Sequence, residues 1–143
     1  MSAQGNRSAE GNLTPKQQAM VDLWERHLRD EFELRSVDET TASMVTEPHN
    51  VNVPVLTGGD GGAGVQEYYG RWFIPENPPD TKITLISRTG GEDRLVDELV
   101  QSFTHSVRMD WMLPGIPPTG KRVEIPVVIV EFRNGKIASE HTH

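Results

Sequence analysis

Apolar residues recur at helical spacing near the start of the chain. They lie three or four positions apart, at Met20, Leu23, Trp24 and Leu28. Charged residues from 25 to 31 fill much of the rest. Thr14 followed by Pro15 is a typical N-cap and first helical residue. The pattern predicts one amphipathic helix over residues 15–34, after a flexible segment of residues 1–13.

Two shorter helices are predicted next. Ser36 and Glu39 have the spacing of a capping box, so a second helix begins at residue 36 and ends before Pro48. In residues 50–56 a valine occupies every second position, which predicts a short strand. Pro54 places this strand at a sheet edge. The glycine-rich residues 57–64 predict a loop. An aromatic-rich third helix follows over residues 65–73.

The second half of the chain reads as strands. The predicted strands cover residues 81–89, 94–109, 122–133 and 136–143. A proline-rich loop, residues 111–120, interrupts them, and Asn134-Gly135 predicts a hairpin turn. The continuous apolar run 125–130 predicts burial on both faces. Helices followed by strands indicate the α+β class, with one domain over residues 14–143.

Composition and charge exclude several classes of function. The 143 residues include no cysteine, which removes disulfides and thiolate chemistry. A net charge of -7 disfavours nucleic-acid binding. No apolar stretch approaches the ~20 residues of a membrane span. We therefore expect a cytoplasmic protein without a nucleic-acid or membrane partner, and we predict no metal and no cofactor.

The strand predicted over residues 94–109 carries the candidate chemistry. Its odd positions run Leu95, Asp97, Leu99, Gln101, Phe103 and His105, which places Asp97 and His105 on one face. Eight residues separate these two, roughly 26 Å at ~3.3 Å per residue, so they do not touch directly. His105 suits a general acid or base because the usual pKa of histidine is near neutral. The alternative is a packed histidine bonded to a neighbour. Asp110 is a further candidate acid if a bulge redirects it.

Aromatic residues suggest a pocket for a flat apolar or cyclic ligand. The alternative is that they form only the core. The predicted ligand contacts are Trp24, Tyr69, Trp72, Phe103, Trp111 and His141.

Three motifs occur in a fixed order in the second half. They are Thr104-His105, the Pro117-Pro118-Thr119-Gly120-Lys121 loop, and the hairpin from Phe132 to Ile137. With the helices in front, they make residues 15–143 resemble the SnoaL-like branch of the nuclear-transport-factor-2-like superfamily. The resemblance implies an α+β cone, in which three helices pack in a strongly curved, mixed and mostly antiparallel sheet around a pocket. It also implies a homodimer through the outer sheet face.

The resemblance extends to function. Such proteins include polyketide cyclases, ketosteroid isomerases, dehydratases, epoxide hydrolases and non-catalytic binding modules. In the cyclases, the histidine matched by His105 pairs with an aspartate on the following strand, where this chain has Val128. The family also usually continues beyond the position of His143.

We predict a small-molecule pocket protein that cyclises, isomerises, hydrates or dehydrates a small apolar or cyclic carbonyl compound without a cofactor. His105 would carry the proton, helped by Asp110 or Asp97. One alternative is a non-catalytic ligand-binding or dimerisation module, which Val128 favours. Another is epoxide-hydrolase-like water activation by an arginine between two carboxylates. Arg88 and Arg108 are the candidates, although the sequence does not place two acids around either.

Overall fold

The computed structural model describes residues 13–133 and 135–143, so the predicted N-terminal segment lies outside it except for Leu13. The first helix is α2, Pro15–Arg29, which continues into a π-helical turn η1, Asp30–Leu34. A short helix α3, Val37–Ala42, follows. The third helix is α4, Gly61–Glu67, extended by a second π-helical turn η2, Tyr68–Phe73. The predictions of the first and third helices are therefore confirmed.

In the described part of the chain, six strands form one sheet in the order β2-β1-β6-β5-β4-β3. Their bounds are β1 Met44–Asn52, β2 Thr57–Asp60, β3 Lys82–Gly90, β4 Arg94–Thr104, β5 Arg122–Arg133 and β6 Lys136–Thr142. Every pair is antiparallel except β1 with β6, which is parallel. The α+β class and the mixed, mostly antiparallel sheet are thus confirmed. The strong curvature implied by the resemblance stays a prediction.

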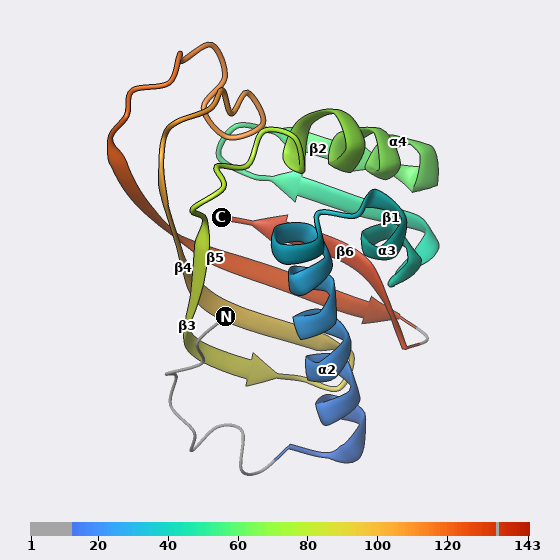
Figure 1. The fold of residues 1–143 in the computed structure, drawn as a ribbon. Coiled ribbons are helices and arrows are strands. Elements are labelled where there is room, and N and C mark those ends of the chain that lie inside the picture. Colours follow the sequence, from blue (N-terminus) through green and yellow to red (C-terminus); the bar gives the residue numbers. More distant parts are fainter. Residues whose placement is uncertain (1–12, 134) are drawn as a thin grey trace.

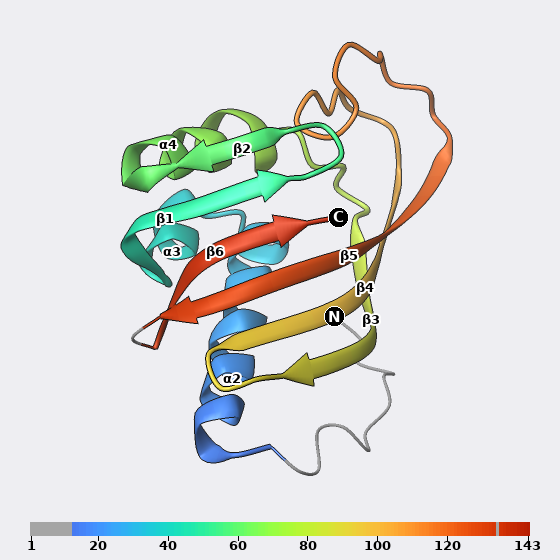
Figure 2. The same cartoon turned by 180° about the vertical axis from the view of Figure 1, so that it is seen from behind.

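The helices lie on one face of the sheet (Figure 1), and among the described residues no helix covers the opposite face (Figure 2). Helix α2 begins with the predicted cap, since Thr14 and Gln17 exchange side-chain-to-backbone hydrogen bonds. The core between helices and sheet is formed by fully buried side chains, which include Trp24, Val65, Tyr69, Leu95, Phe103, Met109, Val130 and Ile137. Among the described residues, no helix is long and apolar enough to cross a membrane.

The second predicted helix is wrong in its latter half. Helix α3 ends at Ala42, and the chain enters β1 at Met44 and passes through Pro48 as a strand. The pairing of β1 with β6 shifts register between Met44 and His49, which accommodates a proline that has no N–H to donate. Strand β1 is also internal rather than at the edge. Its buried side chains include Asn50 and Asn52, and Pro54 lies in the turn that follows.

The glycine-rich residues form structure rather than the predicted loop. Gly58 and Gly59 belong to β2, and α4 begins at Gly61. Gly58 has a φ of +149°, which residues that carry a side chain rarely adopt. A Cβ atom at this position would lie 2.0 Å from the Asn50 carbonyl oxygen. Glycine therefore allows β2 to approach β1 closely.

Replacing Gly58 by alanine is expected to lower the free energy of unfolding by at least about 1 kcal/mol, because the backbone of β1 must move away from the new methyl group. Urea unfolding measures the change. Gly91→Ala is the matched control, since the nearest atom to its Cβ, the Arg94 carbonyl oxygen, lies at an ordinary 3.6 Å. Equal stability of the two variants would contradict the close approach of β2.

Strand β4 is shorter than predicted and ends at Thr104. In the structure the proline-rich loop spans residues 105–121 and so begins at His105. Hydrogen bonds from His105 N to the Lys121 carbonyl oxygen and from Gly120 N to the His105 carbonyl oxygen join its two ends. The strand after it, β5, shows only part of the expected two-sided burial. Val130 is buried but Pro126 is exposed in the single chain.

Candidate functional site

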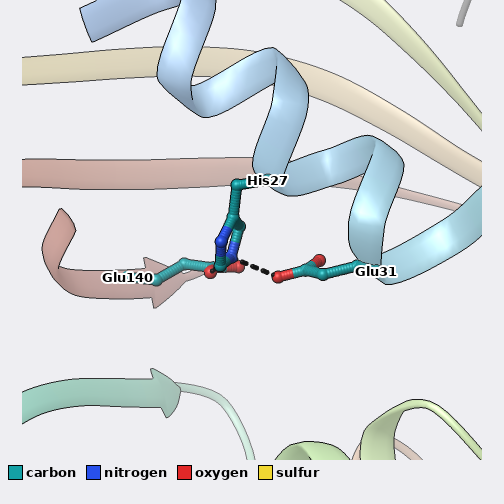
Figure 3. Close-up of side chains that lie close together, drawn as sticks. All are labelled: His27, Glu31 and Glu140. Atoms are coloured by element: carbon teal, nitrogen blue, oxygen red, sulfur yellow. Dashed lines mark hydrogen bonds and ion pairs between the residues drawn. The ribbon is translucent and has the colours of Figure 1, made fainter. Parts of the chain in front are cut away.

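A buried polar cluster forms where α2, η1 and β6 meet. His27 and Glu31 are four residues apart, so the helix presents both on one side. The His27 Nε2 atom lies 2.6 Å from Glu31 Oε1 and 3.2 Å from Glu140 Oε2. Figure 3 shows the imidazole between the two carboxylates. All three residues are buried, with exposed fractions of 0%, 1% and 5%.

Tyr69, from η2, joins the two carboxylates. Its hydroxyl oxygen lies 2.9 Å from Glu31 Oε1 and 3.0 Å from Glu140 Oε2, so it donates to one of them at a time. The same hydroxyl accepts a hydrogen bond of 3.0 Å from Asn50 Nδ2. The cluster is defined as His27, Glu31, Tyr69 and Glu140. Hydrogen bonds connect these four side chains, so protons are able to move between them.

A second contact of His27 determines its protonation. Its Nδ1 lies 2.6 Å from Ser43 Oγ, and that hydroxyl already donates to the Thr40 carbonyl oxygen at 2.7 Å. Ser43 therefore accepts, and Nδ1 carries a proton. Nε2 then faces two carboxylates, which favours a second proton and a charged imidazolium.

Electrostatics in the cluster favour bound protons. Burial alone would lower the pKa of His27, but the charge of Glu31 and hydrogen bonds to both carboxylates outweigh it and raise that pKa to about 10. Burial and the charge of Glu140 raise the pKa of Glu31 to about 7, against the opposing influence of His27 and Tyr69. Burial and the two carboxylates also raise the pKa of Tyr69 well above its usual value. Glu31 is thus able to give or take a proton near neutral pH.

The carboxylates of Glu31 and Glu140 form part of the wall of a cavity of about 40 Å³. The rest of its wall is mostly apolar and includes Leu28, Phe32, Phe73, Ile83, Leu99, Trp111, Met112, Ile125 and Val128. A molecule in this cavity would meet Glu31 and Glu140 on a mostly apolar surface. That arrangement suits proton transfer, because the charges of the cluster are poorly screened there.

The cluster also has the composition of a cation site. One ligand atom from each of His27, Glu31 and Glu140 lies within 4.8 Å of the others. The same atoms are already linked by hydrogen bonds to each other and to Tyr69. The prediction of no metal stays a prediction.

The three predicted acid/base residues do not come together. Asp97 is buried and accepts hydrogen bonds from Arg88 Nε at 2.7 Å, Arg88 Nη2 at 2.8 Å and Trp24 Nε1 at 2.9 Å. Glu25 contacts the same guanidinium at 3.1 Å. Arg88 therefore lies between two carboxylates, a pairing that the sequence alone did not reveal.

His105 and Asp110 belong to the proline-rich loop. His105 is buried, and its Nδ1 accepts a hydrogen bond of 3.3 Å from Thr119 N. Its Nε2 is buried without a hydrogen-bond partner in the described part of the chain. Asp110 binds Arg108 Nε at 2.7 Å and accepts from Gly115 N at 3.0 Å. The Arg108 guanidinium lowers the pKa of Asp110.

The six predicted ligand contacts occupy different places. Trp111 lines the cavity, and Tyr69 binds both of its carboxylates. Trp72 lines a surface hollow of about 280 Å³ that Trp111 also borders. The remaining three are Trp24 beside Asp97, Phe103 in the core, and His141, whose ring lies 5.4 Å from that of His49.

Sequence reasoning missed three residues of the cluster, namely His27, Glu31 and Glu140. The sequence did mark two of them, because they fall on the apolar stripe of the first helix. His27 lies three positions after Trp24, and Glu31 lies three after Leu28, so both fall on the apolar side of α2 and η1. A titratable pair on an apolar stripe indicates a buried polar site. No comparable signal marks Glu140.

No protein-family profile matches the chain, and no curated protein matches it by sequence. Solved structures do match. A candidate SnoaL-like polyketide cyclase from Jannaschia sp. CCS1 has a TM-score of 0.69 at 16% identity, over 91% of this chain and 88% of that one. The epoxide hydrolase/cyclase-like enzyme SalBIII, named for pyran ring formation in salinomycin, has a TM-score of 0.62 at 17% identity, over 87% and 88%.

A third match is a ketosteroid-isomerase-like protein from Catenulispora acidiphila DSM 44928, solved with trimethylamine. Its TM-score is 0.62 at 12% identity, over 90% of this chain and 85% of that one. Identities this low show the fold alone. The chain therefore adopts the fold of SnoaL-like and nuclear-transport-factor-2-like proteins over about nine-tenths of its length, as the sequence motifs predicted.

The raised pKa values in the cluster predict a stability that falls with pH. A raised pKa means that the folded state binds more protons than the unfolded state. The contribution of His27 is complete below pH 6.5 and is lost as the pH rises through about 10. We expect the stability advantage of the wild type over His27→Gln to shrink by at least about 1 kcal/mol across this window. Urea unfolding at several pH values measures it.

The control for this experiment is His49→Gln, which alters an exposed histidine on β1. Its pH profile should follow that of the wild type. A constant difference between wild type and His27→Gln from pH 6 to 10 would contradict the charged state of His27.

Proposed function

We propose that the chain is a cofactor-independent acid/base enzyme that isomerises, cyclises, hydrates or dehydrates a small apolar or cyclic carbonyl compound. One observation carries the proposal. Two buried carboxylates, Glu31 and Glu140, are joined by His27 and Tyr69 and form part of the wall of an apolar cavity. Such a pair is able to move a proton without a metal or cofactor.

Glu31 is the proposed proton carrier. Its ionised form takes a proton from the carbon beside the substrate carbonyl, and the electron pair of the broken C–H bond moves toward the carbonyl oxygen. The protonated form then returns the proton to another atom of the resulting enolate, whose electron pair forms the new bond to that proton. His27 keeps a positive charge beside the carboxylates, and Tyr69 moves its hydrogen bond between them as their charges change.

The names of proteins with this fold support the reaction class. They include cyclase, isomerase and epoxide hydrolase/cyclase-like proteins. The acid that the cyclases carry at the position of Val128 is absent here. Val128 instead lines the cavity. Two residues further along β5, Val130 pairs with Glu140 of β6. We infer that Glu140 and Glu31 supply the carboxylates of this pocket.

The role predicted for His105, helped by Asp110 or Asp97, is a competing proposal. The experiment is a screen of small ketones and cyclic carbonyl compounds by thermal shift, followed by turnover assays of each hit. Loss of turnover in Glu31→Gln with activity kept in His105→Ala supports the buried cluster. The reverse pattern supports His105. Activity kept in both variants contradicts both assignments.

Water activation is the second candidate function, and the size of the cavity favours it. A volume of about 40 Å³ holds a water molecule next to Glu31 and Glu140. Either carboxylate would then act as the base that removes the water proton. The Arg88 site, with Glu25 and Asp97 on either side, has the composition predicted for this chemistry, but these three residues do not line that cavity. Incorporation of ¹⁸O from labelled water into product would identify hydration or hydrolysis, and its absence would exclude them.

The sheet face without helices is the proposed dimer surface (Figure 2). Exposed apolar side chains on β3 and β4 include Ile86 and Val96. Light scattering after size exclusion tests the dimer, and a monomer at high concentration would exclude it. The cytoplasmic location stays a prediction.

A further inference from the structure

Gln101 contributes a carboxamide to the cavity wall. It lies on β4, where it pairs with Ile83 of β3 and Ile125 of β5, and all three residues line the cavity. It belongs to the row of odd positions that β4 turns toward the core, between the buried Leu99 and Phe103. A polar side chain thus occupies a position where its neighbours along the strand are apolar.

The carboxamide of Gln101 has an unused donor in the described part of the chain. Its Nε2 atom is buried and has no hydrogen-bond partner in the described part of the chain. The other amide and indole groups of the cavity wall are engaged. Asn52 Nδ2 donates to Thr57 Oγ1 and to the Tyr68 hydroxyl, and Trp111 Nε1 donates to the Glu76 carbonyl oxygen. A buried donor without an acceptor costs free energy, so a position that keeps one is suited to a ligand that satisfies it.

We propose that the Gln101 carboxamide donates a hydrogen bond to an oxygen of the substrate and selects molecules that carry a carbonyl group. The inference rests on the proposed function and deepens it, because it assigns the substrate oxygen a partner on β4 while Glu31 and Glu140 handle the proton. As the carbonyl becomes an enolate, negative charge grows on that oxygen, and the donor stabilises it. An apolar molecule of the same shape leaves the donor unsatisfied.

The test uses a matched pair of small probes, acetone and 2-methylpropene, because the cavity measures only about 40 Å³. The two molecules have the same shape, but one carries C=O where the other carries C=CH₂. Their dissociation constants are measured by NMR titration of the full chain. We expect the wild type to bind the ketone about tenfold more tightly, and the Gln101 side-chain amide signal to shift only with the ketone. Gln101→Met, which keeps the length of the side chain, should bind both probes equally and should not lose thermal stability. Gln66→Met, an exposed position on α4, is the control and should keep the tenfold preference.

The possible failures are distinct. Equal binding of both probes by the wild type, or an unchanged preference in Gln101→Met, overturns the role of Gln101 and leaves the pocket in place. Loss of stability in Gln101→Met shows a structural role and overturns the inference as well. Binding of neither probe overturns the pocket itself, and with it the proposed function.

Discussion

Replacing Glu31 by glutamine is expected to lower the turnover of an identified substrate by at least about a hundredfold, in line with the usual contribution of a general acid or base. Glutamine keeps the shape of the side chain and its hydrogen bonds but cannot exchange a proton. The raised pKa of Glu31, about 7, makes it the carboxyl best suited to both roles at neutral pH. Steady-state kinetics should show the loss in kcat, with substrate binding changed little.

The control for this prediction is Glu39→Gln, which alters an exposed carboxylate on α3. It should leave kcat unchanged. Glu140→Gln should cause a comparable loss, and the double variant should be little worse than either single one, because the two carboxylates act as a unit. A Glu31→Gln variant with wild-type turnover would rule out the cluster as the site of proton transfer.

Replacing Arg88 by methionine is expected to lower the free energy of unfolding by about 3–5 kcal/mol, which is typical when one partner of a buried ion pair is removed. Arg88 donates two hydrogen bonds to Asp97, which is itself fully buried. Without the guanidinium, an uncompensated carboxylate stays in the core, where Trp24 Nε1 still donates to it at 2.9 Å. Urea unfolding at constant pH measures the loss.

A double variant and a surface control test whether the loss comes from the buried charge. Arg88→Met combined with Asp97→Leu should recover part of the lost stability, because no charge is left buried. Arg71→Met removes an exposed pair with Glu67 and should cost less than about 1 kcal/mol. Equal losses in Arg88→Met and Arg71→Met would show that the buried pair is not stabilising.

The elements of the fold were largely predictable from periodicity. The apolar stripe of α2, its Thr14 cap and the strand patterns of the second half all reflect local physical rules, and the ordered motifs from His105 to Ile137 pointed to the correct fold. The error at Pro48 has a physical reason. A proline disfavours a helix before it and also a regular strand, and only the pairing of β1 with β6 across the chain decides between them.

The candidate site was much less predictable. Asp30 and Glu31 were assigned to the polar side of the first helix, yet both are buried. The charges on this helix look like a solvated face until the other members of the cluster are known. Two of them, Glu140 of β6 and Tyr69 of η2, lie 109 and 38 positions after Glu31 in numbering. The period-two pattern placed His105 and Asp97 on one face of the predicted strand, but their separate partners depend on the proline-rich loop and on β3.

The most direct test of this account is an NMR titration of the cluster. The ¹³Cδ signal of Glu31, assigned by comparison with Glu31→Gln, and the imidazole ¹⁵N signals of His27 are followed from pH 4 to 11. We expect Glu31 to titrate with a midpoint near 7 and the His27 imidazolium to persist until the pH approaches 10. A Glu31 midpoint near the ordinary 4.5, together with a His27 midpoint near 6.5, would contradict a buried carboxyl poised to move protons at the cavity.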